Sequence, residues 1–244
     1  MKISTLIIIQ ILAHIIADYY LQTGIISKEK NIKGFKSHHL YLHVAIITVV
    51  SYVMSFQANF YLAAITIGFS HLLLDGFKRN LGKLKRLQKH LFFIDQLMHI
   101  AMIVIVCLVH EEMYGITPIF EIPFKDKTIA IITGYIICMK PSNIIIRALF
   151  ETYNIKISDE GLDRSNEIAN AGQVIGSIER LLTFSLVLIG QFHAVGFLIA
   201  AKSIIRYKEA DRPKTEYVLI GTLLSFGIAI LLGILCLKYD ALVV

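Results

Sequence analysis

Long apolar runs, separated by short clusters of lysine and arginine, follow one another along the whole chain. Several of these runs are close to the roughly 20 residues that a helix needs to cross a bilayer. The chain has 244 residues, of which 56% are hydrophobic and 17% are charged, and its mean hydropathy is +0.67. A soluble core of this size cannot bury so much apolar surface. The sequence therefore predicts an all-α integral membrane protein built as a polytopic helix bundle.

We expect about eight transmembrane helices, with seven as the alternative. The candidate spans cover residues about 3–22, 40–56, 60–77, 91–110, 127–140, 171–189, 190–206 and 217–237. The alternative arises because Leu181 to Ala201 is about long enough for a single crossing, whereas the charge pattern requires two crossings between Lys140 and Lys202. Two short helices that turn near Gly190 satisfy both requirements.

Basic residues mark the side of the membrane on which each connection lies. Three clusters stand after the first span, after the third span and before the last span: Lys28, Lys30, Lys33 and Lys36; Lys78, Arg79, Lys83, Lys85, Arg86 and Lys89; Lys202, Arg206, Lys208, Arg212 and Lys214. Because lysine and arginine are enriched on the cytoplasmic side, we expect an integral protein of the plasma (inner) membrane with both termini outside. The net charge of +6 follows this membrane pattern, and we expect no nucleic acid as partner.

We divide the chain into a four-helix membrane module, residues 1–112, and a C-terminal helical module, residues 113–244. The second module includes a short cytoplasmic segment around residues 141–167, because Pro141 suits the first turn of a new helix. Cys107, Cys138 and Cys236 stand singly in apolar runs and predict neither disulfides nor a thiolate metal site.

Four pairs of potential metal ligands are spaced four residues apart within the first four spans. The pairs are His14 with Asp18, His39 with His43, His71 with Asp75, and Asp95 with His99. This spacing puts both members of a pair on one face of a helix. The orientation derived from the basic clusters places all four pairs at the same depth, near the cytoplasmic face. Ionisable groups inside a membrane are costly and normally face the bundle interior, where they are paired or bind metal.

The residue types define the chemistry of this predicted site. Five imidazoles and three carboxylates without a thiolate suit one or two divalent ions, with zinc favoured and manganese or iron(II) as alternatives. Lys36, Lys78 and Gln22 lie beside the pairs in the sequence and are candidate contacts for a phosphate or leaving group. Both lysines are equally well explained as ordinary residues of the cytoplasmic side.

The second half contains a weaker group of polar residues within apolar helices. Glu179 and Arg180 are adjacent, so they lie on different faces of a helix and each needs a partner, while Lys202 and Arg206 are one turn apart. These residues are either a further site or a set of charges that neutralise one another within the bundle.

The paired positions also resemble a known family. The run His14-Ile-Ile-Ala-Asp18-Tyr-Tyr-Leu-Gln22 and the motifs around Lys36, His71 and Asp95 are similar to bacterial membrane proteins of domain-of-unknown-function family 3307, over residues of about 3–110. The motifs Ile178-Glu179-Arg180, Ala200-Ala201-Lys202-Ser203 and Glu216 to Thr222 resemble the carboxy-terminal extension of longer members. A fainter similarity to membrane-bound metal-dependent hydrolases implies metal binding and a hydrolase activity.

Two classes of function are consistent with these observations. The first is an integral-membrane metal-dependent hydrolase that acts near the cytoplasmic face, on a phosphoester of a lipid or an anionic small molecule. The second is a non-catalytic membrane protein in which the metal or the polar network serves a structural, sensing or transport role. The sequence identifies neither the substrate nor the oligomeric state.

Overall fold

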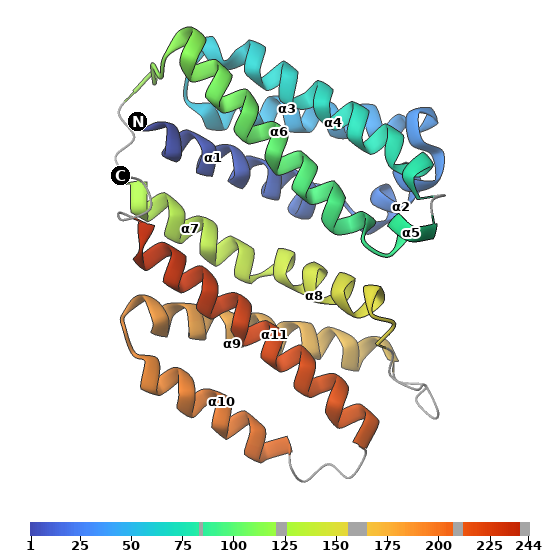
Figure 1. Cartoon of the computed structure of the whole chain (residues 1–244), viewed down its shortest axis with the longest axis vertical. Coiled ribbons are helices and arrows are strands. Elements are labelled where there is room, and N and C mark those ends of the chain that lie inside the picture. The colour runs from blue at the N-terminus through green and yellow to red at the C-terminus, as the bar shows by residue number, and fades with distance from the viewer. Residues whose placement is uncertain (83–84, 121–125, 156–164, 207–211, 240–244) are drawn as a thin grey trace. The chain divides into compact units, whose positions relative to one another are not determined.

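The protein is all-α, as predicted. A computed structural model describes residues 1–82, 85–120, 126–155, 165–206 and 212–239, and the described residues contain helices and turns but no strand (Figure 1). The α-helices are α1 (Ile3–Ile15), α2 (Gly24–Lys33), α3 (His38–Ser55), α4 (Tyr61–Leu81), α5 (Lys85–Gln88), α6 (Leu91–Tyr114), α7 (Asp126–Cys138), α8 (Lys140–Thr152), α9 (Ser165–Leu188), α10 (Phe192–Arg206) and α11 (Arg212–Leu237). A π-helical turn, η1 (Ile16–Tyr20), continues α1, and the 3-10 turns η2 (Gly34–Lys36) and η3 (Ala58–Phe60) precede α3 and α4.

Five helical segments in the described residues are long and apolar enough to cross a membrane. They are Ile3–Tyr20, His38–Ser55, Ala58–Lys78, Leu91–Tyr114 and Val218–Leu237. The pair α7 and α8 passes the same test only as one bent unit, with an angle of 50° between its two parts. The expected count of eight is not confirmed: among the described residues α7 passes only together with α8, α9 is not one of the candidate spans, and α10 contains a shorter apolar segment, Phe192–Ile204. The hairpin that connects α9 and α10 does turn at Gly190, whose φ of 74° suits a residue without a side chain.

The chain forms two compact units, Met1–Ile129 and Ala130–Val244. In the first unit, α1 packs against α3 and α6, and α4 packs against the same two helices. These contacts define a four-helix bundle in the order α1, α3, α4, α6 around its axis. The short helix α2 lies outside this ring and packs mainly against α4.

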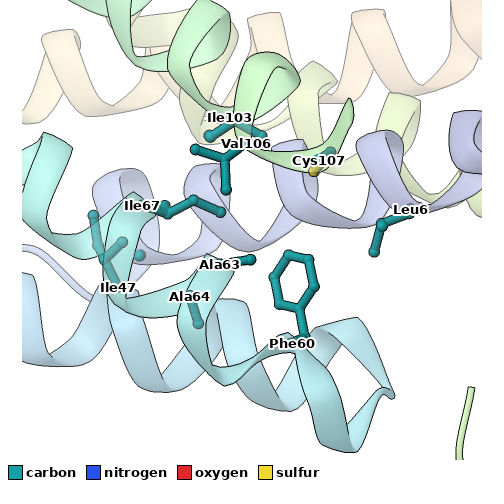
Figure 2. Close-up of a cluster of buried hydrophobic side chains, with 10 residues drawn as sticks. Leu6, Ile47, Phe60, Ala63, Ala64, Ile67, Ile103, Val106 and Cys107 are labelled. Atoms are coloured by element: carbon teal, nitrogen blue, oxygen red, sulfur yellow. The ribbon is translucent and has the colours of Figure 1, made fainter. Parts of the chain in front are cut away.

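The apolar core of the first unit lies between the helices of the bundle (Figure 2). It contains Leu6 of α1, Ala17 of η1, Ile47 of α3, Ala63, Ala64 and Ile67 of α4, Ile103, Val106 and Cys107 of α6, and Phe60 of η3. Side chains on the outer faces of the same helices are apolar but exposed, as with Val49 and Phe69, which are 60% and 57% exposed. An apolar outer surface around a filled core is typical of helices that face lipid.

In the second unit, α9 packs against α8, α10 and α11. Pro141 stands in the first turn of α8, as the sequence predicts, and its fixed φ suits that position. The predicted cytoplasmic segment around 141–167 begins with α8, but residues 156–164 lie outside the described part of the chain. Lys83 also lies outside it.

Candidate metal centre

Seven of the eight predicted ligands converge toward one end of the bundle, next to the apolar core. Helix α1, with its continuation η1, and helix α4 end there, whereas α3 and α6 begin there. Because the helices alternate in direction, residues far apart in the sequence lie at the same position along the bundle axis. The seven are His14, Asp18, His43, His71, Asp75, Asp95 and His99, which we call the His/Asp centre. Six of them are buried and Asp18 is partly buried.

The four imidazole rings of the centre form a contiguous group. His71 lies in the middle, with its ring centroid 3.9 Å from that of His99, 5.0 Å from that of His14 and 6.0 Å from that of His43. Each ring comes from a different helix of the bundle. Imidazole nitrogens are common ligands of zinc and related divalent ions.

The carboxylates lie between these rings. Asp18 Oδ1 is 3.1 Å from His43 Nε2 and 3.7 Å from His14 Nδ1. Asp75 is 3.9 Å from His43 Nε2 through Oδ2 and 4.0 Å from His99 Nε2 through Oδ1. Three overlapping groups therefore each have their ligand atoms within 4.8 Å of one another: His14, Asp18 and His71; His43, His71 and Asp75; Asp75, Asp95 and His99.

Several polar atoms of the centre are buried without a hydrogen-bond partner among the described residues. They include both ring nitrogens of His71 and of His14, together with Asp18 Oδ1, His43 Nε2 and His99 Nε2. Buried polar atoms are nearly always paired, because an unpaired one costs about 1–3 kcal/mol. So many unpaired atoms in one place indicate that the centre is built to hold a further group.

His99 is fixed by its own helix. Its Nδ1 lies 2.7 Å from the backbone carbonyl oxygen of Asp95, and since that oxygen only accepts, Nδ1 is the donor. The lone pair of neutral His99 is then on Nε2, toward Asp75. A second polar contact supports the same helix, because Tyr19 donates to Gln96 Oε1 at 3.0 Å.

Asp18 lies in the π-helical turn η1, which the sequence analysis did not anticipate. Leu21 N donates to the carbonyl oxygen of Ile16, five residues earlier, at 3.0 Å. Such wide turns are rare and occur often at functional sites. Here the wide turn is located where α1 presents Asp18 to His43 of the neighbouring helix.

His39 is the predicted ligand that the structure does not bring to the centre. Its Nε2 lies 3.3 Å from Glu29 Oε2 on α2, and its side chain is 40% exposed. His39 stands in the first turn of α3, where it faces the surface helix, while His43 one turn later faces the bundle axis. The hydrogen bond from Lys33 lowers the pKa of Glu29, so this surface partner of His39 is anionic at neutral pH.

Of the predicted phosphate contacts, Lys78 lies at the centre and Lys36 does not. Lys78 Nζ is 2.8 Å from Asp95 Oδ2, at the edge of the centre. Gln22 is partly exposed, and its Nε2 is buried without a hydrogen-bond partner in the described chain. Lys36 is exposed in η2, and no contact places it at the centre.

Lys30, which is not among the predicted site residues, enters the centre from α2. Its Nζ lies 2.6 Å from Asp75 Oδ2, and the residue is only 5% exposed. Lys30 belongs to a cluster of lysines that the sequence analysis explained as cytoplasmic charges. Nothing in the local pattern distinguishes it from Lys28 or Lys33, because its burial depends on how α2 docks on α4.

The polar residues of the second unit find separate partners. Glu179 forms an ion pair with Lys202, whose ammonium group also lies 5.7 Å from the centroid of the Phe226 ring. Arg180 is 1% exposed and donates to the carbonyl oxygen of Cys138 and to Asn143 Oδ1, both at 2.6 Å. Arg206 ends α10, and its side chain lies outside the described part of the structure.

Comparison with known proteins supports the resemblance found in the sequence. Residues 6–120 match the model of the DUF3307 family, described as a protein of unknown function. The matched residues lie within the first unit and include the whole His/Asp centre. No curated protein and no solved structure matches the chain.

Proposed function

We propose that the His/Asp centre binds a divalent metal ion and hydrolyses a phosphoester at the cytoplasmic face of the inner membrane. The observation that carries the proposal is His71, whose two buried nitrogens have no hydrogen-bond partner and are surrounded by ligand atoms of three other helices. A neutral imidazole in that environment is stabilised when a cation binds the lone pair of its unprotonated nitrogen. Zinc, manganese and iron(II) all accept imidazole and carboxylate ligands together.

The spacing of the ligand atoms supports this proposal. Two ligands of a tetrahedral zinc ion, with bonds of about 2.0–2.1 Å, lie roughly 3.3 Å apart. The distances of Asp18 Oδ1 from His43 Nε2 and His14 Nδ1, 3.1 and 3.7 Å, bracket that value. His71 has a ligand atom within 4.8 Å of those of His14 and Asp18.

The ionised groups around the centre favour an anionic substrate. Lys30 and Lys78 contribute two positive charges next to three carboxylates, which gives a net charge of −1. One divalent ion changes this to +1. When bound, such an ion would polarise a phosphoryl oxygen and lower the pKa of a coordinated water. Lys78, only partly buried beside Asp95, is suited to stabilise developing charge on a phosphate.

The location of the centre supports action from the cytoplasm. The same end of the bundle has the exposed lysines Lys28, Lys33 and Lys36 and the expected positive-inside connection after α4. A substrate that reaches this end is either a soluble phosphoester or a lipid headgroup.

A second candidate function follows from the two lysine contacts. Lys30 with Asp75 and Lys78 with Asp95 neutralise two of the three carboxylates without any metal. This arrangement favours a structural or proton-conducting network, in which a bound metal would only hold the helices together. The two candidates differ in whether metal loading produces turnover.

The test begins with elemental analysis of the full-length protein, purified in detergent and reloaded separately with zinc, manganese and iron(II). We expect bound metal in the wild type and in His39→Ala, and its loss in His71→Ala. Loaded wild-type protein should then hydrolyse a phosphoester such as p-nitrophenyl phosphate or a phosphatidic acid, while Lys78→Ala should retain metal and lose most turnover. Metal binding without hydrolysis across a broad phosphoester panel would favour the structural candidate, and metal-free wild-type protein would refute the proposal.

A further inference from the structure

We infer that the His/Asp centre holds a single divalent ion, because the ammonium groups of Lys30 and Lys78 take the place of a second cation at Asp75 and Asp95. The single ion belongs at Asp18, with His14, His43 and His71 as its nitrogen ligands. This inference rests on the proposed metal binding and narrows the predicted one or two ions to one.

The three carboxylates differ in their partners. Asp75 and Asp95 each have a lysine ammonium group within 2.8 Å, at 2.6 and 2.8 Å respectively. The ion pairs of Asp18 in the described structure involve only the imidazoles of His14 and His43, neither of which brings a permanent charge. Of the three, Asp18 is therefore the carboxylate that still requires a cation.

The unpaired atoms are distributed in the same way. Asp18 Oδ1, His43 Nε2 and both nitrogens of His14 and His71 are buried without hydrogen-bond partners, while the carboxylate oxygens of Asp75 and Asp95 are not among the unpaired atoms of the described chain. His99 contributes one unpaired nitrogen, Nε2, which lies 4.0 Å from a carboxylate that already has Lys30. Unsatisfied ligand atoms thus gather around Asp18.

The burial of Lys30 supports its role as a fixed counter-ion. Lysine is almost never fully buried unless it is paired, yet this side chain is only 6% exposed. Its neighbours on α2 remain at the surface, with Lys33 at 56% exposure and Ile32 at 71%. The helix is held in place at its C-terminal end, where the ring of Phe35 lies so close to Gly76 that a Cβ there would be 2.2 Å from it. Gly76 follows Asp75 directly, so the contact that fixes α2 also aligns Lys30 with its carboxylate.

Charge balance gives the same result. With one divalent ion, the formal charges of the three carboxylates, the two ammonium groups and the metal sum to +1. With two ions, the sum is +3. Net charge at membrane depth is costly. A second ion therefore becomes favourable only when a lysine has been removed.

The experiment measures the number of manganese ions on each full-length chain. Detergent-purified protein is loaded with Mn²⁺, dialysed, analysed for metal content and examined by electron paramagnetic resonance, which distinguishes an isolated Mn²⁺ from a coupled pair. We expect one ion per chain with the isolated spectrum in the wild type. The Lys30→Met/Lys78→Met double variant should rise to two ions per chain with a coupled spectrum. Lys33→Met is the matched control on α2 and should remain at one.

The possible outcomes separate this inference from the proposed function. Two coupled ions in the wild type would overturn the inference and leave metal binding intact. No bound ion in the wild type would refute the proposed function itself. If the double variant folds and still binds one ion, the lysines do not exclude the second cation, and the inference is wrong. If it fails to fold, the wild-type spectrum alone still decides between one ion and two.

Discussion

His99 donates a hydrogen bond from Nδ1 to the backbone carbonyl oxygen of Asp95, one turn earlier on α6, at 2.7 Å. The contact fixes both the orientation and the tautomer of the ring, and it leaves Nε2 directed toward Asp75. Because its Nε2 lies near Asp75, which already has Lys30 as its partner, His99 borders the inferred metal position at Asp18. Its ring also packs on that of His71, 3.9 Å away between centroids.

We predict that His99→Ala weakens metal binding about 10- to 100-fold without abolishing it, which is the usual effect of losing a residue that supports metal ligands. The reason is that His71 would lose the neighbour that holds its ring in place. Competition with a chelator of known affinity measures the change. A loss as complete as that of His71→Ala would instead identify His99 as a direct ligand.

His43 and His39 provide a matched pair on one helix. His43 is 3% exposed at the centre, whereas His39 faces Glu29 at the surface. We predict that His43→Ala loses the metal at ordinary loading concentrations, while His39→Ala retains it with nearly unchanged affinity. Elemental analysis of the two variants beside the wild type tests this. Equal loss in both variants would place His39 among the ligands after all.

The spans of the first unit could be predicted to within a few residues because hydropathy records which residues face lipid. Spans expected at 3–22 and 60–77 compare with Ile3–Tyr20 and Ala58–Lys78 in the structure. The shared position of His14, His71 and His99 along the bundle axis could also be predicted, since it follows from helix direction and the distribution of basic residues. The spans and this shared position both depend on the residue pattern along single helices.

The parts that could not be predicted depend on contacts between elements. The structure places His39 beside Glu29 and not at the centre, because a spacing of four residues does not say which member of a pair lies at the surface end of a helix. The role of Lys30 could not be predicted because it depends on α2, a helix between the first two spans that docks on the bundle.

The partners of Arg180 come from α7, α8 and α11, far away in the sequence, and no local signal identifies them.

Gly68 lets α3 and α4 approach closely beside the centre. A Cβ at this position would lie 2.0 Å from Thr48 Oγ1, and Gly68 stands one turn before His71. We predict that Gly68→Ala destabilises the protein by about 1–3 kcal/mol, because the added methyl group forces the helices apart. Metal affinity should fall as well, since His43 comes from α3 and His71 from α4.

Gly227→Ala is the control for this substitution. A Cβ at Gly227, within α11, meets no other atom within 4 Å, so the variant should match the wild type or exceed its stability by up to about 1 kcal/mol. The chain has no tryptophan, but its three cysteines are buried and carry thiol groups that a reagent can label on unfolding. Thermal unfolding can therefore be followed with a thiol-reactive fluorescent dye. A Gly68→Ala variant as stable as Gly227→Ala would show that Thr48 moves aside without cost.

Arg180 is a buried cation whose partners in the described structure are all neutral. Besides Cys138 and Asn143, its guanidinium donates to Ser225 Oγ at 2.8 Å, to Ser177 Oγ at 3.1 Å and to the carbonyl oxygen of Met139 at 3.4 Å. One of these acceptors, the carbonyl oxygen of Cys138, ends α7, where the last carbonyls of a helix have no intrahelical amide partner. Arg180 thus stabilises the bend by donating to this carbonyl and to acceptors on α8 and α11.

We predict that Arg180→Met destabilises the second unit by about 3 kcal/mol or more, because several buried acceptors lose their donor at once. Metal content should remain at the wild-type level, since the His/Asp centre belongs to the first unit. The exposed Arg147→Met in α8 is the control for the lost charge and should stay within about 0.5 kcal/mol of the wild type.

Mass spectrometry of dye-labelled protein distinguishes the two units, because Cys138 and Cys236 belong to the second and Cys107 to the first. Labelling of Cys138 and Cys236 should begin at a lower temperature in Arg180→Met, ahead of Cys107. Simultaneous labelling of all three would mean that the two units unfold together, and an unchanged labelling temperature would mean that the bend does not depend on Arg180.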